Sequence, residues 1–429
     1  MKKNLVKKAI VGLLTCALFF GTVACNFQNG DASSVSQSSA SVGQSDTGEN
    51  SEVSSEGSDE GSSEGSSEGR GEGENTIPVM TVTQFEAPVW LVNEAVKEFY
   101  SASADTLLRT ILLNYAQPNK DRAEGVTIGY TISDLPIDTA VSEAVVSVYE
   151  RGESQAWKTV NFASGKNTIT IYNMKTGMPY DFSITATLSN GDVLTENGSF
   201  ETAESVRLMN LDDIHNVRDI GGRLTEDGRK IKQGLFYRGT ELDGAVEPKY
   251  YNLSASGIKE MTETLGIKME IDLRSKKTNM RSVLGENVKH LYYDMSYYSS
   301  VIVNGGGQAK VKAVFDELAK PENYPVYLHC TYGMDRTGTV CFILGALLGM
   351  SELDLIRDYE LTKLCDVLAG SNGWRDRTDT EFNKYLVSFK ALQGETMQQK
   401  AINYLLNIGI TQSQIDTILA LFLEDAVRV

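Results

Sequence analysis

The chain contains 429 residues and carries a formal net charge of −17 at pH 7. The first 24 residues carry +4 and residues 26–75 carry −10, which leaves −11 for the rest of the chain. Because nucleic acids and anionic membranes attract positive charge, this acidity argues against nucleic-acid binding and against membrane binding by general electrostatics. Residues 76–429 form a longer chain than one hydrophobic core usually stabilises, so we expect two folded units.

The amino terminus has the pattern of an export signal. Lysines at positions 2, 3, 7 and 8 precede an apolar run at residues 9–23, and Thr22-Val23-Ala24-Cys25 resembles a bacterial lipobox. The pattern predicts a lipoprotein signal peptide at residues 1–24 and a lipid on Cys25. The protein is then extracytoplasmic and anchored to the bacterial cell membrane. A plain secretory signal and an uncleaved anchor are the alternatives.

Residues 25–75 are rich in Ser, Gly and acidic side chains, with Ser-Ser-Glu-Gly recurring. Such a composition cannot bury enough apolar surface to build a core. We therefore interpret residues 25–75 as a disordered tether.

Residues 76–205 are predicted to form a β-sandwich. A short helix is indicated at residues 103–115, and strands separated by turn signals follow from about residue 125. The strands are expected at residues 126–132, 143–149, 157–162, 168–172, 180–188 and 193–202. Met-Lys-Thr-Gly-Met-Pro-Tyr at residues 174–180 resembles a strand corner of fibronectin type III domains, with Tyr180 as the corner tyrosine. A generic immunoglobulin-like sandwich is the alternative. This region either docks a ligand or gives structural support. The fold alone does not identify its partner.

The strongest chemical signal is the stretch His-Cys-Thr-Tyr-Gly-Met-Asp-Arg-Thr-Gly at residues 329–338. A short buried strand is predicted at residues 326–328 and an apolar helix at residues 337–350, so the loop between them lies at a helix N-terminus. Backbone N–H groups and the helix dipole favour an anion there, and a thiol in this field can be a thiolate.

This arrangement predicts a phosphate cradle with a nucleophile at its base. Cys330 is the candidate nucleophile, and Arg336 offers a planar fork that can hold phosphoryl oxygens. Thr337 can donate its hydroxyl to the sulfur when sulfur leaves. The alternative is a purely structural role for Cys330, as a buried cysteine in a strand-to-helix turn.

At these residues the chain resembles the cysteine-dependent protein tyrosine phosphatases, with signature His-Cys, five residues, Arg-Ser/Thr. Stretches at residues 216–222, 236–239, 271–275 and 358–362 make it similar to the bacterial atypical, secreted-type group. The resemblance spans residues 207–429 and implies an α/β catalytic domain at 206–429, a central sheet flanked by helices. It also implies a phosphate-binding loop formed by Thr331, Tyr332, Gly333, Met334 and Thr337. The secreted enzymes usually carry lysine where this chain has Met334, which favours phosphotyrosine over phosphoinositide.

The general acid has three candidates. In the resembling family the aspartate at the position of Asp335 is taken as the acid. Asp294 and Asp272 end strand-like runs and are the alternatives, although strand-end carboxylates are often satisfied by backbone N–H groups. His329 is interpreted as a supporting group beside the nucleophile. Residues 216–222, Arg238 and Arg274 either line the substrate mouth or hold the fold together.

No metal is predicted, because His215, His290 and His329 lack ligand spacing, and the chemistry requires no cofactor. Cys341 is predicted to be a small core residue. Residues 297–308, with consecutive glycines at 305–307, indicate a mobile segment bordering the pocket.

The sequence therefore predicts a cell-surface phosphatase that acts on phosphotyrosine in a phosphorylated protein or peptide through a phosphocysteine intermediate. A phosphoinositide or inositol polyphosphate is the alternative substrate. A catalytically silent phosphate-binding protein and an adhesion-type surface protein are alternatives from other classes.

Overall fold

The computed structural model describes residues 77–115, 123–246, 251–275, 281–365 and 376–425. The predicted signal peptide, the lipid site Cys25 and the tether lie outside the described residues. The described residues, from Ile77 to Asp425, all belong to one compact unit.

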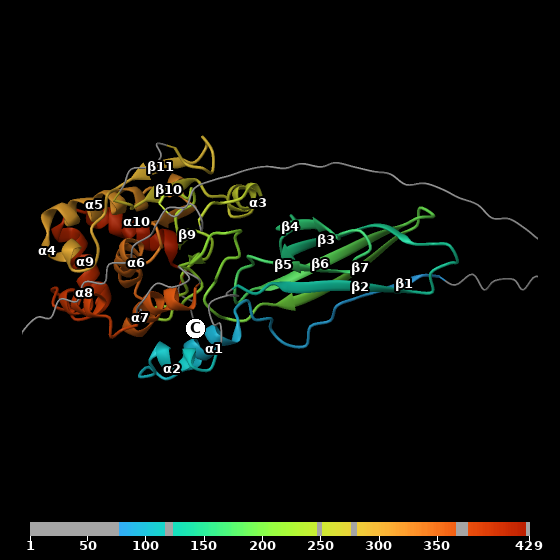
Figure 1. Cartoon of the computed structure of the whole chain (residues 1–429), viewed down its shortest axis with the longest axis horizontal. Helices are drawn as coiled ribbons and strands as arrows, with labels where there is room; N and C mark the ends of the chain where they lie inside the picture. The colour runs from blue at the N-terminus through green and yellow to red at the C-terminus, as the bar shows by residue number, and fades with distance from the viewer. Residues whose placement is uncertain (1–76, 116–122, 247–250, 276–280, 366–375, 426–429) are drawn as a thin grey trace, which may run out of the picture. The chain divides into compact units, whose positions relative to one another are not determined.

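The first part of this unit contains two antiparallel sheets (Figure 1). One has the strand order β1-β2-β5, with bounds Val79–Val82 (β1), Val126–Ser133 (β2) and Thr168–Ile171 (β5). The other has the order β4-β3-β6-β7, with bounds Lys158–Asn161 (β4), Val141–Glu150 (β3), Pro179–Leu188 (β6) and Val193–Glu201 (β7). The strands predicted from sequence alternation are confirmed, each within two residues at either end.

The two sheets share one apolar core. In β6 buried and partly exposed residues alternate along the whole strand, as period-2 geometry requires. Val126 and Ile128 of β2 and Val146 and Ile184 of the other sheet belong to the same buried cluster. The hydroxyl of buried Tyr180 accepts a hydrogen bond from the backbone N–H of Lys175 at 2.9 Å.

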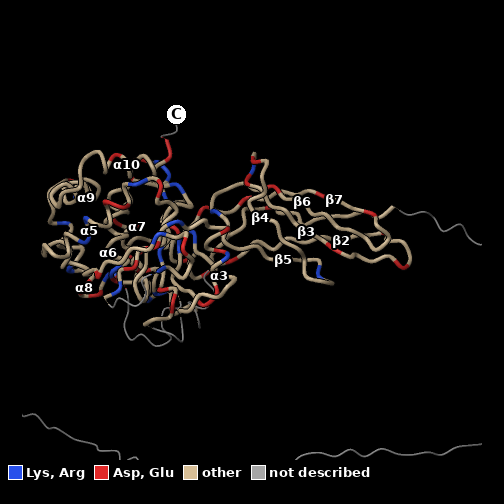
Figure 2. Tube along the Cα trace, turned by 90° about the horizontal axis from the view of Figure 1, so that it is seen from above, with Lys and Arg blue, Asp and Glu red and all other residues tan. Residues whose placement is uncertain are grey.

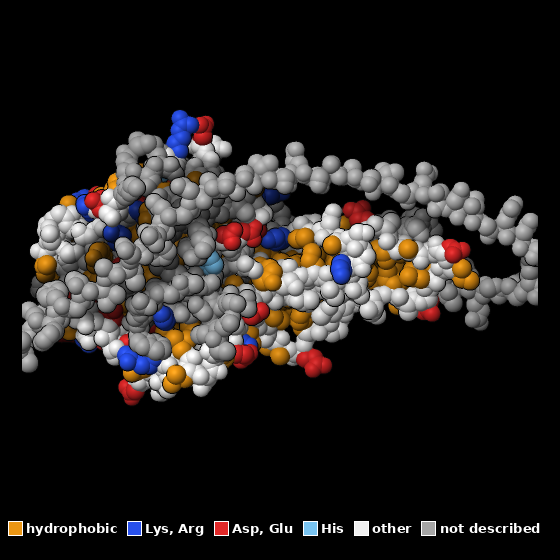
Figure 3. All heavy atoms as spheres, in the orientation of Figure 1, with side chains coloured by type: hydrophobic (Ala, Val, Ile, Leu, Met, Phe, Trp, Pro, Cys, Tyr) orange, Lys and Arg blue, Asp and Glu red, His pale blue; other side chains and the backbone are white. Residues whose placement is uncertain are grey.

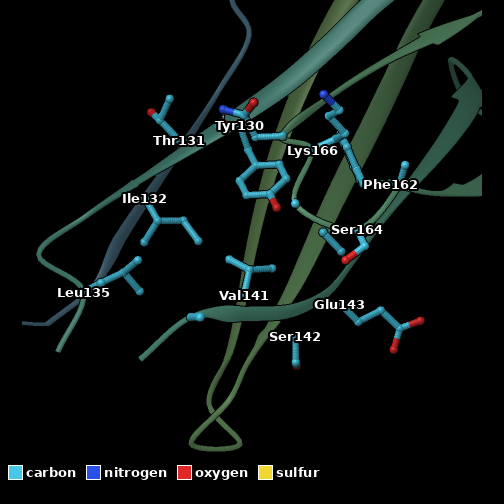
Figure 4. A pocket seen from close by; sticks show the side chains of 15 residues that line it. Tyr130, Thr131, Ile132, Leu135, Val141, Ser142, Glu143, Phe162, Ser164 and Lys166 are labelled. Carbon is cyan, nitrogen blue, oxygen red and sulfur yellow. Dashed lines mark hydrogen bonds between the residues drawn. The ribbon is translucent and has the colours of Figure 1, made fainter. Parts of the chain in front are cut away.

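Hydrophobic side chains reach the surface at several places along the part that carries β1–β7 (Figure 3). A cavity of about 530 Å³ lies between strands of this part, lined among others by Tyr130, Ile132, Val141 and Phe162. The ring of Tyr130 points into it, between Ile132 and Val141 (Figure 4). The described residues that line this cavity include no candidate catalytic side chain.

Two short helices interrupt the chain between β1 and β2. Asn93 caps Glu94–Ser101 (α1) by accepting a hydrogen bond from Val96 N, and Leu108–Leu112 (α2) follows. The helix predicted at residues 103–115 corresponds to α2, whereas α1 was not predicted. Both helices lie beside α7, residues Glu352–Leu361 (Figure 1).

The second part contains a five-stranded sheet of order β11-β10-β12-β9-β8. Its strands are Lys289–Tyr292 (β11), Met269–Asp272 (β10), Val326–His329 (β12), Phe236–Gly239 (β9) and Arg218–Asp219 (β8). Neighbouring strands are parallel except β8 and β9. The predicted central sheet flanked by helices is confirmed, and β12 lies in the middle of it.

The helices of this part pack around that sheet. In addition to α7 they comprise Ala255–Lys259 (α3), Glu260–Thr264 (η1), Ser300–Val303 (α4), Gly305–Leu318 (α5), Pro321–Asn323 (η2), Asp335–Leu347 (α6), Thr362–Leu364 (η3), Thr380–Lys390 (α8), Met397–Asn407 (α9) and Gln412–Phe422 (α10). Thr411 caps α10 in a capping box with Gln414.

The apolar helix α6 forms much of the second core. Val340, Ile343 and Leu344 are fully buried in one cluster with Ile271 of β10 and Leu328 of β12. This burial fixes α6 against the sheet and so fixes the loop that precedes it. In the described part of the chain, no helix is both long and apolar enough to cross a bilayer.

Candidate active site

The loop 330–334 joins the central strand β12 to helix α6, as the sequence predicted. The helix begins at Asp335, two residues earlier than expected. Register places His329, the last residue of β12, opposite Asp272 and Gly239. Cys330 therefore lies at the carboxyl ends of the parallel strands, where α/β proteins commonly bind ligands.

The turn of this loop is held by side chains from distant segments. Asn216 donates from Nδ2 to the carbonyl oxygens of Tyr332 and Gly333, both at 3.1 Å, and Arg238 donates to the Gly333 carbonyl at 2.6 Å. Gly333 has φ +63°, and a Cβ there would lie 2.4 Å from the backbone oxygen of Gly239. The position therefore requires glycine.

Asp358 of α7 binds the arginines that surround this turn. Its carboxylate accepts hydrogen bonds from Arg218 at 2.9 Å, Arg223 at 2.9 Å and Arg238 at 2.5 Å. Burial alone would raise the pKa of Asp358, but these guanidinium groups hold it well below its ordinary value. Basic and acidic residues accordingly lie side by side in the middle of the second part (Figure 2).

These contacts decide between the two interpretations of the motif at residues 216–222. Arg218 also donates to Asn216, and Asp219 accepts from the backbone N–H of Gly221 at 2.8 Å and of Gly234 at 2.6 Å. The polar side chains of the motif thus bind the chain itself. They hold the fold and the loop together.

Arg274 and Asp272 form a second buried network. Arg274 donates to Asp272, Glu241 and Asp243 at 2.5–3.1 Å, and its backbone N–H reaches Asp272 at 2.8 Å. Burial opposes ionisation of Asp272, but His329 and Arg274 lower its pKa below the ordinary value. Both carboxylate oxygens of Asp272 accept hydrogen bonds from Arg274, so this geometry favours the orienting role for Asp272.

Asp335 lies in the first turn of α6 and is partly exposed. The hydroxyl of Tyr298 donates a hydrogen bond to its Oδ1. Burial, followed by the charge of Asp335, raises the pKa of Tyr298, so the tyrosine stays a donor. Asp294, the alternative acid, is exposed, and its backbone carbonyl accepts from Lys310.

Arg336 extends toward the segment 275–297. Its Nε donates to the Met295 carbonyl at 3.1 Å, and a terminal nitrogen donates to the Ser275 hydroxyl at 3.0 Å. The guanidinium carbon lies 5.6 Å from the ring centre of Tyr297. Tyr297 of the segment 297–308 therefore lies beside the first turn of α6, and within this segment the chain forms α4 and begins α5.

Met334 of the loop has a buried side chain. Its side chain is 5% exposed and belongs to an apolar cluster with Phe99 of α1 and Leu361 of α7. The side chain is thus directed into the protein interior, and the backbone of this residue is what remains to bind phosphate. Thr337, in contrast, keeps a buried hydroxyl without a hydrogen-bond partner among the described residues.

Glu270 supports His329, a role that sequence reasoning missed. The Glu270 carboxylate lies 2.9 Å from Nε2 of His329 and 3.8 Å from Nε2 of His290. Burial opposes protonation of His329, but the Glu270 hydrogen bond and the charges of Asp272 and Glu270 raise its pKa above the ordinary value, against the opposing charge of Arg274. The sequence did contain a signal for this role. A carboxylate lies within the buried run of residues 269–272, and a buried charge requires a partner.

Cys330, Cys341 and Cys365 are buried and free of disulfide bonds. Burial raises the pKa of the Cys341 thiol to about 11, which agrees with the predicted core role. Among the described residues, no group of three or more His, Cys, Asp or Glu side chains is placed to hold a metal ion.

The sequence model of the tyrosine phosphatase family matches residues 209–424. This match covers half of the chain, so the chain belongs to the tyrosine phosphatase family.

The similarity to individual proteins is lower. A protein from Cupriavidus necator, provisionally named a tyrosine-protein phosphatase, is 27% identical over 174 residues, which cover 35% of this chain and 60% of that protein. A tyrosine-protein phosphatase from Nostoc commune is 24% identical over 126 residues, which cover 24% of this chain and 43% of that protein. The chain thus spans less than two thirds of the length of either relative.

Among solved structures, the core catalytic domain of the PP-IP phosphatase SIW14 from S. cerevisiae in complex with citrate is similar. That match has 14% identity and a TM-score of 0.25 and covers 38% of this chain and 87% of the other. A likeness of this size carries no argument about substrate.

We predict that Glu270→Gln destabilises the protein in a pH-dependent way. The raised pKa of His329 contributes stability that is fully present below its unfolded value of about 6.5 and is lost as pH rises through the folded value. The variant should therefore lose about 1 to 2 kcal/mol of unfolding free energy at pH 5.5 and much less at pH 8.5. Urea unfolding at both pH values measures this. A loss of equal size at the two pH values would contradict the role given to Glu270.

Proposed function

We propose that this protein hydrolyses phosphate monoesters through a phosphocysteine intermediate. The observation that supports this mechanism most directly is the position of Cys330 at the end of the central strand, with Asp335 and Arg336 in the first turn of α6. Sγ of Cys330 attacks phosphorus, the bond from phosphorus to the ester oxygen breaks, and Asp335 protonates that oxygen.

A water molecule then resolves the intermediate. Its oxygen attacks phosphorus, gives its proton to the Asp335 carboxylate, and the phosphorus–sulfur bond breaks. The Thr337 hydroxyl, which has no hydrogen-bond partner among the described residues, donates to the leaving thiolate. In both steps the loop amides, the start of α6 and Arg336 stabilise the charge on the phosphoryl oxygens.

Phosphotyrosine in a protein or peptide is the substrate that we propose. Tyr297 is 48% exposed beside Arg336, so its ring is available to a substrate ring next to the phosphate-binding group. At Met334 the loop carries a buried apolar side chain instead of a cation that would favour a polyanionic headgroup. These observations support phosphotyrosine over a phosphoinositide or an inositol polyphosphate.

We further propose that the enzyme acts outside the cell. The lipobox-like residues ending at Cys25 and the tether at residues 25–75 support a lipid-anchored catalytic domain at residues 206–429. The strand orders β1-β2-β5 and β4-β3-β6-β7 and the Tyr180 hydrogen bond support a fibronectin type III-like sandwich, in which a corner tyrosine bonds to backbone upstream.

Variants of the nucleophile and the acid test the mechanism. Cys330→Ser should lower kcat/KM for p-nitrophenyl phosphate by roughly a thousandfold or more, because serine is a much weaker nucleophile here. Asp335→Asn should slow phenyl phosphate by about 100-fold or more but slow p-nitrophenyl phosphate little, because the nitrophenolate needs no proton to leave. Wild-type turnover by Cys330→Ser would disprove the cysteine mechanism, and equal slowing of both esters would remove Asp335 as the acid.

A kinetic panel tests the substrate class. We expect kcat/KM to be highest for phosphotyrosine peptides, compared side by side with phosphoserine peptides, phosphoinositides and inositol hexakisphosphate. Tyr297→Ala should raise KM for the phosphotyrosine peptide, because it removes the ring beside the phosphate. If a phosphoinositide or inositol hexakisphosphate is turned over best, the alternative substrate class is correct.

The lipid anchor has its own test. In a bacterial host with lipoprotein processing, the wild-type protein should sediment with membranes and carry a diacylglyceryl group on Cys25 in mass spectra of the amino-terminal peptide. Cys25→Ala should lack the lipid. An unmodified wild-type peptide that begins at another residue would indicate a plain secretory signal.

A further inference from the structure

The segment of residues 92–112, here named the α1–α2 segment, packs against the phosphate loop. It lies outside the residues matched by the family, yet its apolar face joins a cluster with loop residue Met334. The buried members of that cluster are Val92, Ala95, Val96, Phe99, Leu108, Ile111, Val206, Leu208, Met334, Leu361, Leu364 and Cys365. The loop residue Tyr332 packs against the same cluster from a partly buried position.

An arginine of the catalytic part binds the end of the first helix of this segment. Arg357 of α7 donates to the backbone oxygens of Tyr100 at 3.0 Å and Ala102 at 2.5 Å. Its guanidinium also lies 5.8 Å from the ring centres of Phe99 and Tyr100. The carbonyls at the end of α1, which no helix turn satisfies, thus find their partner on α7.

The second helix and the residues before it are attached by an ion pair and by a carbonyl contact. Arg109 of α2 donates to Asp376 at 2.8 Å and 3.1 Å. Arg377 donates to the backbone oxygen of Ala104 while it pairs with buried Glu360 at 2.8 Å. The segment is therefore attached to the catalytic part by apolar and charged contacts along its length.

The phosphate loop is consequently held from two sides. Asn216 and Arg238 bind the carbonyl oxygens of its turn, and the next side chain along the loop, Met334, is buried in the same apolar cluster as the α1–α2 segment. A methionine side chain has three rotatable bonds and takes a fixed position only where its neighbours enclose it. The packing of this cluster therefore holds the Met334 side chain next to the start of α6.

We propose that Phe99 is a positioning residue for the phosphate loop, acting through Met334, and that the α1–α2 segment is part of the catalytic unit. This inference rests on the proposed function, because the loop is taken as the phosphate site. Phe99 touches neither substrate nor reacting atoms. It fixes the loop backbone that must match the phosphoryl oxygens, a geometry in which a displacement of about 1 Å can cost roughly 100-fold in rate.

A matched pair of variants of the full chain tests the proposal. Phe99 and Phe182 are 1% and 2% exposed, and Phe182 lies in the core of the sheets β1–β7, in a different cluster from the loop. Phe99→Leu and Phe182→Leu remove the same atoms and should both lower Tm. Measured below both transitions, Phe99→Leu should lower kcat for phenyl phosphate and raise the inhibition constant of inorganic vanadate about tenfold or more. Phe182→Leu should stay within about twofold of wild type.

Equal changes in both variants, or a wild-type vanadate constant in Phe99→Leu, would overturn the proposal. The rise in Tm on adding inorganic phosphate measures the loop without turnover. A wild-type protein that fails to turn over esters but is stabilised by phosphate would remove the proposed function. In that case a smaller phosphate-induced rise in Phe99→Leu than in Phe182→Leu still supports the positioning role, and an equal rise overturns it.

Discussion

The buried carboxylate of Asp358 is the interaction on which the phosphate loop depends. Its partners Arg218 and Arg238 are 140 and 120 residues away in sequence, so one side chain joins β8, β9 and α7. A buried guanidinium without a counter-charge is strongly unfavourable, and each of these arginines takes its place because Asp358 is there. Since Arg238 also binds the Gly333 carbonyl, this charge balance determines where the loop turns.

The arginines around the site divide into two kinds by their partners. Arg238 and Arg274 are buried, and each forms ion pairs with carboxylates, so their charge is largely neutralised within the fold. Arg336 is partly exposed, and in the described part of the chain its hydrogen bonds go to a carbonyl and a hydroxyl. A guanidinium with neutral partners keeps its charge for an incoming anion. This difference, more than sequence position, separates the phosphate-binding arginine from the structural ones.

Local patterns predicted much of this structure, and long-range contacts account for what was missed. The strand, loop and helix around Cys330 and the strands of both sheets follow from periodicity within a few residues. The partnership of Asn216 with Gly333 links positions 117 residues apart, and no window of sequence contains it. The sequence did show Met334 as an apolar residue in a polar loop. The α1–α2 segment in the same cluster lies more than 220 residues upstream, and α1 itself was not predicted.

The net charge of −17 and a phosphate site are compatible because electrostatic fields in salt are local. At physiological ionic strength the Debye length is about 8 Å, so charges more than that distance from the loop contribute little there. Near Cys330, His329 is hydrogen-bonded to Glu270, whereas the start of α6 and Arg336 add positive potential. An anion that reaches the start of α6 therefore meets the positive potential there, whatever the net charge of the whole chain.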